Sequence, residues 1–332
     1  MSVLSSIEYS VLDLVPVTDT GTEAEAISNA VALAQTAERL GYKRFWLAEH
    51  HNMDGIASAA TAVLIGHIAA ATHTIRVGAG GVMLPNHAPL VVAENFGTLA
   101  TIYPGRIDLG LGRAPGGDRL TLRALRRHND TNVNDFPEQV ALLEQLFGPE
   151  QPGQRLFARP GTNTRVPIWL LGSSLFSAQL AAMRGLPYSF ASHFAPALLH
   201  QALKVYRDNF QPSEFLDKPH VMVAAPLLLA PTDSEAEYLA TTALQRGLAL
   251  IRGEGLRMKP PVDDMDALWH PREKHAILSM YGEALIGGPD TVSKKLKILI
   301  ESTQADEVIF TCDFYEHAHR ERALTQLAEL VT

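Results

Sequence analysis

The runs VMVAAPLLLA, residues 221–230, and IWLL, residues 168–171, are apolar without interruption. A strand with one face in water alternates apolar and polar residues, whereas a strand covered on both faces reads as a continuous apolar run. Such runs are typical of a parallel sheet with helices packed against it. Segments rich in β-branched or aromatic residues predict strands at Tyr9–Leu14, Arg44–Ala48, Ile75–Val82, Arg106–Leu111, Pro167–Leu171, Tyr188–Ala191, Val221–Leu229 and Glu307–Thr311.

Each predicted strand is followed by a segment that reads as a helix. Thr22 and Glu25 form a capping box at the start of the first helix, and Gly41 supplies its stop. Later helices are expected near residues 58–71, 89–103, 136–147, 174–184, 196–209, 234–246 and 316–330. Eight such units give either a closed (β/α)8 TIM barrel or a doubly wound open sheet. Because no linker or change of composition divides the chain, we expect one barrel domain over residues 1–332.

Two stretches interrupt this alternation. Residues 112–134 follow the fourth strand and are rich in Gly, Arg and Asp, while Gly247–Gly288 forms an insertion between strands 7 and 8. The insertion is too long for an ordinary connection. In a barrel both stretches leave the C-terminal ends of strands, where barrel active sites lie. The insertion is therefore either a lid over a site or a surface excursion.

Composition and charge argue against several classes of protein. The chain has a single cysteine, Cys312, so no internal disulfide can form. The net charge of −8, with only one short basic cluster at Arg119–Arg127, argues against nucleic-acid binding. The first residues lack the pattern of a signal peptide, and no apolar run is long enough to span a bilayer. We therefore expect a cytoplasmic protein.

The strand at 44–48 ends in three ionisable residues, Glu49, His50 and His51. At a barrel mouth, a histidine can take or give a proton near neutral pH. A Glu-His-His set can also ligate zinc, although adjacent strand residues point to opposite faces and would not easily share one ion. A hydrogen-bonded structural histidine at a strand end is a third interpretation. The residues alone leave these interpretations open.

Glycines interrupt the strand IRVGAGGVMLP, residues 75–85, at Gly78, Gly80 and Gly81. Glycine within a strand commonly marks either the close approach of a ligand to the backbone or a tight bend. The pattern is not the Gly-x-Gly-x-x-Gly dinucleotide motif, because Val82 and Met83 continue the strand instead of opening a helix. A ligand contact and a bend without a ligand both remain open.

Two polar segments follow the fourth and fifth strands. Arg113 is suited to a phosphate or carboxylate, or to a surface ion pair. Ser173, Ser174 and Ser177 stand at a helix start, where free N–H groups and hydroxyls make an anion site and where a serine can also cap the helix. A phosphate-bearing cofactor across the barrel mouth would reach all of these residues, the glycine strand and His50.

Five runs, taken together, resemble the bacterial luciferase-like flavin-dependent monooxygenases, and especially the single-chain branch of that family. The runs are FWLAEHH (45–51), IRVGAGGVMLP (75–85), YPGRIDLGLGRAPG (103–116), LGSSLFSA (171–178) and ADEVIF (305–310). The resemblance spans nearly the whole chain in the expected order. It implies a TIM barrel that binds FMN, as FMNH2, and uses O2 through a C4a-peroxyflavin to oxidise a small organic substrate, with an aldehyde as one candidate.

The resemblance also implies roles for individual residues. His50 matches the catalytic histidine, and a non-prolyl cis peptide is expected between Gly80 and Gly81. Arg113 matches the arginine that pairs with the flavin phosphate. The cofactor-binding residues expected on this basis are Ala79, Gly80, Gly81, Arg113, Ser173, Ser174 and Ser177, and no metal ligand is expected.

The partners expected from the resemblance are a separate NAD(P)H-dependent flavin reductase, which would supply FMNH2, and a second copy of the chain in a homodimer through the second and third helices. The chain has no Rossmann motif that would hold NAD(P)H itself. Two positions depart from luciferase alpha chains, where Gly112 replaces a cysteine and Ser173 replaces a glutamate. The first departure argues against a long-lived, light-emitting intermediate.

Three other functions are weighed against this one. A deazaflavin-dependent dehydrogenase shares the fold, although the EHH run argues against it. A catalytically silent flavin-binding protein is disfavoured by the retention of His50 and Arg113, and a metal hydrolase is the most distant alternative. Four large side chains are candidates either for an apolar cavity or for the core: Met83, Tyr188, Phe194 and Trp269.

Overall fold

A computed structural model describes residues 3–114, 119–125 and 135–332. Eight parallel strands form a ring, in which β6 pairs with β7 and β1 pairs with β9. They are β1 (Glu8–Asp13), β2 (Arg44–Leu47), β3 (Arg76–Met83), β4 (Ile107–Gly112), β5 (Ile168–Gly172), β6 (Tyr188–Phe190), β7 (Val221–Leu229) and β9 (Glu307–Thr311). The chain therefore forms the predicted (β/α)8 TIM barrel and not an open sheet.

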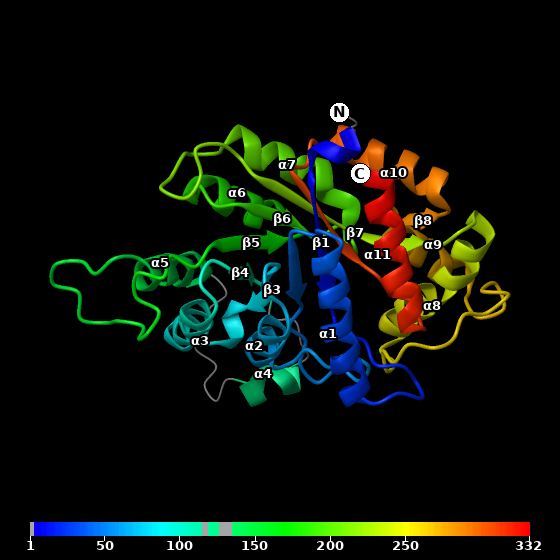
Figure 1. Ribbon diagram of the computed structural model, residues 1–332, viewed down its shortest axis with the longest axis horizontal. Helices are drawn as coiled ribbons and strands as arrows, with labels where there is room; N and C mark the ends of the chain where they lie inside the picture. Colours follow the sequence, from blue (N-terminus) through cyan, green and yellow to red (C-terminus); the bar gives the residue numbers. More distant parts are fainter. Residues whose placement is uncertain (1–2, 115–118, 126–134) are drawn as a thin grey trace.

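Helices surround the ring of strands, and both termini lie at the same end of the molecule (Figure 1). The helices are α1 (Glu23–Arg39), α2 (Thr61–Ala71), α3 (Pro89–Ile102), α4 (Arg119–Leu125), α5 (Phe136–Phe147), α6 (Leu175–Arg184), α7 (Leu199–Asp208), α8 (Asp233–Arg252), α9 (Pro271–Met280), α10 (Pro289–Thr303) and α11 (His317–Val331). The predicted capping box forms at Thr22, and the chain leaves α1 through Gly41 with a φ of 80°. None of the helices in the described ranges has the length and apolar character that a bilayer span requires.

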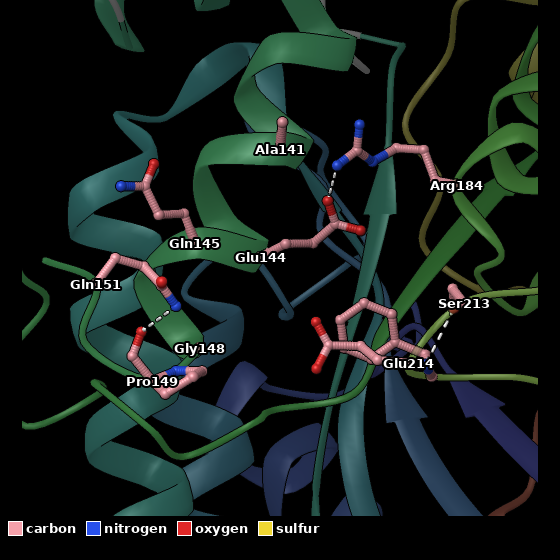
Figure 2. Close-up of a pocket in the computed structure, with 10 residues that line it drawn as sticks. Ala141, Glu144, Gln145, Gly148, Pro149, Gln151, Arg184, Ser213 and Glu214 are labelled. Atoms are coloured by element: carbon pink, nitrogen blue, oxygen red, sulfur yellow. Dashed lines mark hydrogen bonds and ion pairs between the residues drawn. The ribbon is translucent and has the colours of Figure 1, made fainter. Parts of the chain in front are cut away.

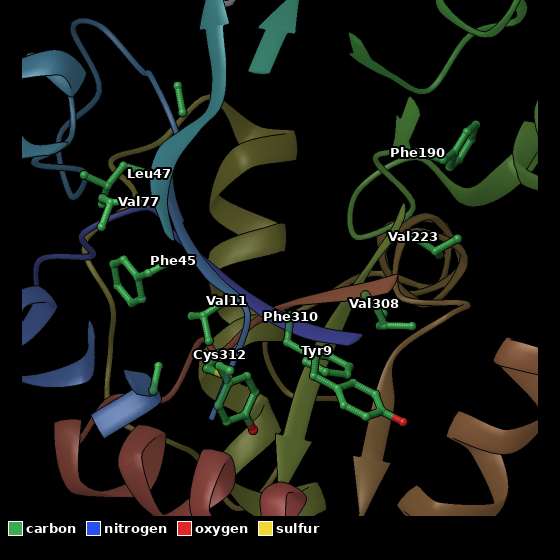
Figure 3. Packing of buried hydrophobic residues seen from close by; sticks show 14 of the residues in the cluster. Tyr9, Val11, Phe45, Leu47, Val77, Phe190, Val223, Val308, Phe310 and Cys312 are labelled. Carbon is green, nitrogen blue, oxygen red and sulfur yellow. The ribbon is translucent and has the colours of Figure 1, made fainter. Parts of the chain in front are cut away.

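Alternate residues of each strand face opposite sides of the barrel wall. Phe45 and Leu47 of β2 pack outward against the helices, whereas Trp46 points into the barrel. Figure 3 shows outward-facing side chains from several strands. The inward-facing cluster consists of Leu12, Trp46, Ala48, Trp169, Met222, Ala224 and Ile309. The barrel interior is thus filled by side chains from most of its strands.

A buried ionic network closes the end of the barrel at which the strands begin. Arg44, the first residue of β2, donates hydrogen bonds to Glu307 and Asp108, each at 2.8 Å. All three residues are at most 5% exposed, and the guanidinium lies 4.7 Å over the Trp169 ring. Burial raises the pKa of Glu307, but the His220 imidazole 3.8 Å away and the charge and hydrogen bonds of Arg44 outweigh it, so this pKa is lowered. The opposite end, where the strands stop, is left for a ligand.

The insertion predicted at Gly247–Gly288 has more regular structure than the sequence indicated. Helix α8 continues to Arg252 and stops at Gly253, whose φ of 70° is left-handed. Helix α9 and a short ninth strand, β8 (Leu285–Gly287), follow, and β8 pairs with β7. Helix α10 then leads into β9, and the sequence patterns did not predict it.

The segment after α8 is fixed to loops at the barrel mouth. The Leu256 N–H donates to the Asp54 carbonyl at 2.8 Å, and the Met258 N–H donates to the Val17 carbonyl at 2.9 Å. Arg257 forms ion pairs with Asp54 at 2.8 Å and with Glu23 at 2.7 Å. The segment is therefore built into the mouth of the barrel and is not a surface excursion.

Candidate active site

A cavity of about 850 Å³ opens at the end of the barrel where the strands stop. Its base includes Leu12, Trp46, Ala224 and Ile309, all from the inward-facing cluster. The volume falls within the roughly 300–1,000 Å³ that is usual for small-molecule and cofactor sites. The structure thus provides a largely apolar chamber at the position where barrel enzymes bind their ligands.

Most of the predicted site residues meet in this cavity. Those that line it are His50, Gly80, Gly81, Arg113, Ser173, Ser174 and Ser177. Ala79 does not line it, because strand alternation turns its fully buried side chain into the outer core. Among the large side chains proposed for a cavity, Met83 and Phe194 line it, whereas Tyr188 and Trp269 are not among the lining residues.

The glycine strand forms a bare stretch of the cavity wall. The Gly80–Gly81 peptide is cis, as the resemblance implied. A Cβ atom on Gly80 would lie 2.8 Å from Leu12 Cδ1 and 3.0 Å from Trp46 Cε3, and one on Gly81 would lie 2.8 Å from the Gly110 carbonyl oxygen. Because these positions leave no room for side chains, the backbone itself forms the wall. A flat ligand can therefore approach the main chain closely.

Arg113 and the start of α6 form a region suited to an anion. The Arg113 guanidinium lies 4.0 Å over the ring of Phe176, which belongs to α6. Ser174 is the N-cap residue of α6, but its hydroxyl makes no capping hydrogen bond. The Ser177 hydroxyl is buried and donates to the Ser174 carbonyl at 2.9 Å. The capping alternative is thus not realised by Ser174, and the first N–H groups of α6 are available to a phosphate.

In the folded chain the side chains of Glu49 and His51 lie together, whereas His50 is not part of their group. Glu49 Oε1 lies 2.8 Å from His51 Nε2 and 2.7 Å from His87 Nε2, and this carboxylate is buried. Burial raises the pKa of Glu49, but hydrogen bonds to His87 and His51 outweigh it and lower the pKa. The ligand atoms of Glu49, His51 and His87 lie within 4.8 Å of one another, which is close enough for a metal ion. Glu49 Oε1, however, already hydrogen-bonds to both histidines, and His50 is not part of the set.

Three residues that the sequence analysis missed lie in the same cavity as His50. They are His193 after β6, Arg246 on α8 and Asp313 after β9. Arg246 Nη1 lies 3.1 Å from Asp313 Oδ1. His193 and Asp313 each follow a barrel strand, so their position was a usable signal. Arg246 lies inside a helix, and nothing in its local sequence distinguished it.

The two imidazoles in the cavity are neutral at pH 7. Burial lowers the pKa of His50 to about 4, and the nearby charge of Arg246 contributes. Burial also lowers the pKa of His193 to about 4, although the charge of Asp313 acts in the opposite direction. The Nδ1 atoms of both residues are buried and have no hydrogen-bond partner among the described residues. Each imidazole can therefore accept a proton from a ligand.

These lowered pKa values predict a pH-dependent stability. An unfolded histidine has a pKa of about 6.5, so the contribution is complete above this pH and is lost as the pH falls towards 4. We expect the double variant His50→Gln/His193→Gln to lose less stability than the unmodified protein across this window. Urea unfolding at a series of pH values measures the difference. Identical losses in the two proteins would contradict the pKa assignments.

A second hollow, of about 390 Å³, lies on the outer surface beside α5 and α6 (Figure 2). Arg184 of α6 points across it and forms an ion pair with Glu144 of α5. These two charges satisfy each other, and the hollow lies outside the ring of strands. The barrel cavity, with its anion-binding region and neutral imidazoles, is therefore the candidate active site.

The fold and the cavity define a (β/α)8 barrel with a ligand site at its C-terminal mouth, which is the architecture of barrel enzymes. A family model described as luciferase-like monooxygenase matches residues 7–307. The chain belongs to the luciferase-like monooxygenase family, whose activity is that of an oxidoreductase.

Close relatives extend over nearly the whole chain. A protein of Escherichia coli (strain K12) named luciferase-like monooxygenase is 49% identical over 315 residues, which is 95% of this chain and 94% of the relative. The uncharacterized protein YvbT of Bacillus subtilis (strain 168) is 52% identical over 322 residues, which is 97% and 96% of the two chains. The crystal structure of apo-MsnO8 is 32% identical, has a TM-score of 0.86 and covers 98% of each chain.

More distant solved structures share the fold alone. One is the oxygenating constituent of 3,6-diketocamphane monooxygenase of Pseudomonas putida, in complex with FMN, at 20% identity and a TM-score of 0.71 over 98% of this chain and 97% of the other. Another is an F420-dependent secondary alcohol dehydrogenase, at 16% identity and a TM-score of 0.70 over 98% and 99%. These two proteins, one in complex with FMN and the other dependent on F420, have the same barrel fold as this chain.

Proposed function

We propose that this protein is an FMN-dependent monooxygenase that uses FMNH2 and O2 to oxidise a small organic substrate. A separate NAD(P)H-dependent flavin reductase would supply the FMNH2. One observation carries the proposal: a single cavity brings together the bare Gly80–Gly81 wall, Arg113 beside the start of α6, and the neutral His50. Bound FMNH2 supplies the electrons for the reduction of O2.

The residues at the α6 side of the cavity bind and orient the cofactor. Arg113 would donate charge-assisted hydrogen bonds to the flavin phosphate, and the N–H groups at the start of α6 would complete the anion site. The backbone at Gly80 and Gly81 would lie against the flat ring system, because these residues have no side chains to stand in between. Leu12 and Trp46 keep water away from that face.

His50 is the residue that would transfer a proton to and from the bound ligand. Its imidazole is uncharged at pH 7, and its Nδ1 is buried without a partner among the described residues. An uncharged imidazole facing the ligand accepts a proton as a general base and returns it as a general acid. The cavity around His50 is apolar enough to limit the exchange of this proton with bulk water.

The cofactor assignment is tested by removing the phosphate partner. We expect Arg113→Ala to weaken FMN binding about 10- to 100-fold, because a hydrogen-bonded charge pair is lost. Riboflavin binding should change little, since riboflavin has no phosphate. Anaerobic titration of the reduced flavins measures both affinities, and Arg155→Ala, which removes an exposed arginine of the α5–β5 connection, is the matched control. Equal effects on FMN and riboflavin would remove Arg113 from the phosphate site.

The second candidate function is a deazaflavin-dependent dehydrogenase, because a solved neighbour with the same fold uses F420. Titration with reduced F420 under the same anaerobic conditions separates the two candidates. Tighter binding of the deazaflavin than of FMNH2 would favour the dehydrogenase. Release of hydrogen peroxide without any oxygenated product, across a panel of organic substrates, would instead indicate a silent flavin-binding protein.

A further inference from the structure

One side of the cavity contains a buried arginine that lacks a full set of hydrogen-bond partners within the described ranges of the chain. Arg246 of α8 is 7% exposed and lines the cavity together with Asp313. Its Nη1 lies 3.1 Å from Asp313 Oδ1, whereas its Nη2 is buried and has no hydrogen-bond partner among the described residues. A guanidinium carries five N–H donors, and a buried donor without an acceptor is destabilising. Arg246 therefore carries an unused N–H donor at the wall of the cavity.

The charge of Arg246 is already compensated within the protein. Asp313 supplies the opposite charge, and the neighbouring imidazoles of His50 and His193 are neutral at pH 7 because burial lowers both pKa values to about 4. A carboxylate bound to Arg246 would therefore lie close to the carboxylate of Asp313, and like charges in a buried site repel strongly. An uncharged oxygen acceptor satisfies Nη2 without this repulsion.

The cavity that Arg246 lines also has apolar residues in its wall. Leu250 and Leu256, from the end of α8 and the segment after it, and Met280, from α9, line the same cavity. The hydroxyl of Tyr281, which also lines it, donates to the Ala243 carbonyl at 2.9 Å and is thus already engaged. This side of the cavity suits a molecule with a hydrocarbon body and one oxygen acceptor.

We propose that Arg246, positioned by Asp313, determines substrate specificity by donating a hydrogen bond from Nη2 to an uncharged carbonyl oxygen of the substrate. The hydrocarbon part of the substrate lies against Leu250, Leu256 and Met280. The assignment rests on the proposed function, because it places the flavin on the Arg113 side of the cavity and the substrate on the Arg246 side.

Three small probes test this by calorimetric titration at neutral pH. Hexan-2-one supplies a carbonyl oxygen, 2-methylhex-1-ene has a CH2 group in place of that oxygen, and hexanoate supplies a charged carboxylate. The unmodified protein should bind the ketone about 10- to 100-fold more tightly than the alkene, the range expected for a hydrogen bond to a charged donor. It should also bind the ketone more tightly than hexanoate. The titrations are made with and without FMN.

Two variants and one control test whether Arg246 and Asp313 cause the preference for the ketone. Arg246→Met keeps a long side chain without N–H donors, and it should abolish the preference for the ketone over the alkene. Arg252→Met on the same helix removes an arginine that is paired with Glu273 outside the cavity, and it should keep the preference. Asp313→Asn leaves the charge of Arg246 uncompensated, and it should shift the preference towards hexanoate.

The inference is overturned if the unmodified protein does not distinguish the ketone from the alkene, or if Arg246→Met still does. If the unmodified protein binds hexanoate more tightly than hexan-2-one, the assignment of an uncharged acceptor is wrong. If Arg246→Met does not fold, the shift towards hexanoate in Asp313→Asn decides the matter, and its absence counts against the proposal. A ketone preference in a protein that fails to bind FMN would support the role of Arg246 and remove the proposed function alone.

Discussion

His50→Ala is expected to lower the turnover of oxygenation about 10²- to 10⁴-fold, the usual contribution of a positioned general acid or base. The reason is that His50 lines the cavity as an uncharged imidazole, whose buried Nδ1 has no hydrogen-bond partner in the described part of the chain. FMN affinity should change little, because the phosphate partners lie on the Arg113 side. Turnover is measured with reductase-supplied FMNH2, by quantifying the oxygenated product of whichever substrate a panel identifies.

The neighbouring histidine provides the control for this prediction. His51 bonds to Glu49 and is not among the residues that line the cavity, so His51→Ala should affect turnover far less. Added imidazole should partly restore the His50→Ala variant, since the substitution leaves space for it beside the ligand. The proton-transfer role would be refuted by equal losses in both variants or by unchanged turnover in His50→Ala. Because the pKa of His50 is about 4, the acid limb of the rate profile should fall near that pH in the unliganded enzyme.

The second large effect is expected on stability, at the closed end of the barrel. Arg44→Leu should lower the free energy of unfolding by about 3–5 kcal/mol, because it leaves Glu307 buried without its arginine partner and leaves Asp108 with Arg76 as its remaining arginine. The pKa of Glu307 is held low partly by Arg44, so this carboxylate would lose much of what keeps it ionised. Urea unfolding followed by circular dichroism measures the change.

The adjacent residue in the chain again offers a control. Lys43 pairs with Glu8 at 2.6 Å, but both side chains are 42% exposed, so the pair should contribute only about 0–1 kcal/mol. Lys43→Leu is therefore expected to leave the unfolding midpoint almost unchanged. If the two leucine variants unfold at the same urea concentration, the ionic network does not stabilise the barrel as described.

The positions of the strands could be predicted because each is encoded locally. Continuous apolar runs such as IWLL indicate strands covered on both faces, and the observed β5 (Ile168–Gly172) lies close to the predicted range. Helix α5 (Phe136–Phe147) begins and ends where its pattern indicated. Strand β8 was missed because it lies at the end of the segment Gly247–Gly288, whose glycines and prolines suggested an irregular insertion. Helix α10, which follows this segment directly, was missed as well.

The candidate site likewise contains residues that could be predicted from the sequence and residues that could not. Gly80, Gly81, Arg113 and the serines at the start of α6 could be predicted because each follows or interrupts a barrel strand, in runs that resemble the family. Ala79 did not join the site, because the alternation of the strand directs its side chain into the outer core.

By itself, the sequence determined the number and order of the barrel strands, the family, and the residues on the Arg113 side of the cavity, because these depend on short runs of neighbouring residues. Only the tertiary structure brought Arg246 to Asp313 and placed both in one cavity with His50 and His193. These residues come from parts of the chain separated by tens to hundreds of positions. Their meeting depends on the closure of the ring between β6 and β7 and on the packing of α8 over its mouth, which no local pattern encodes.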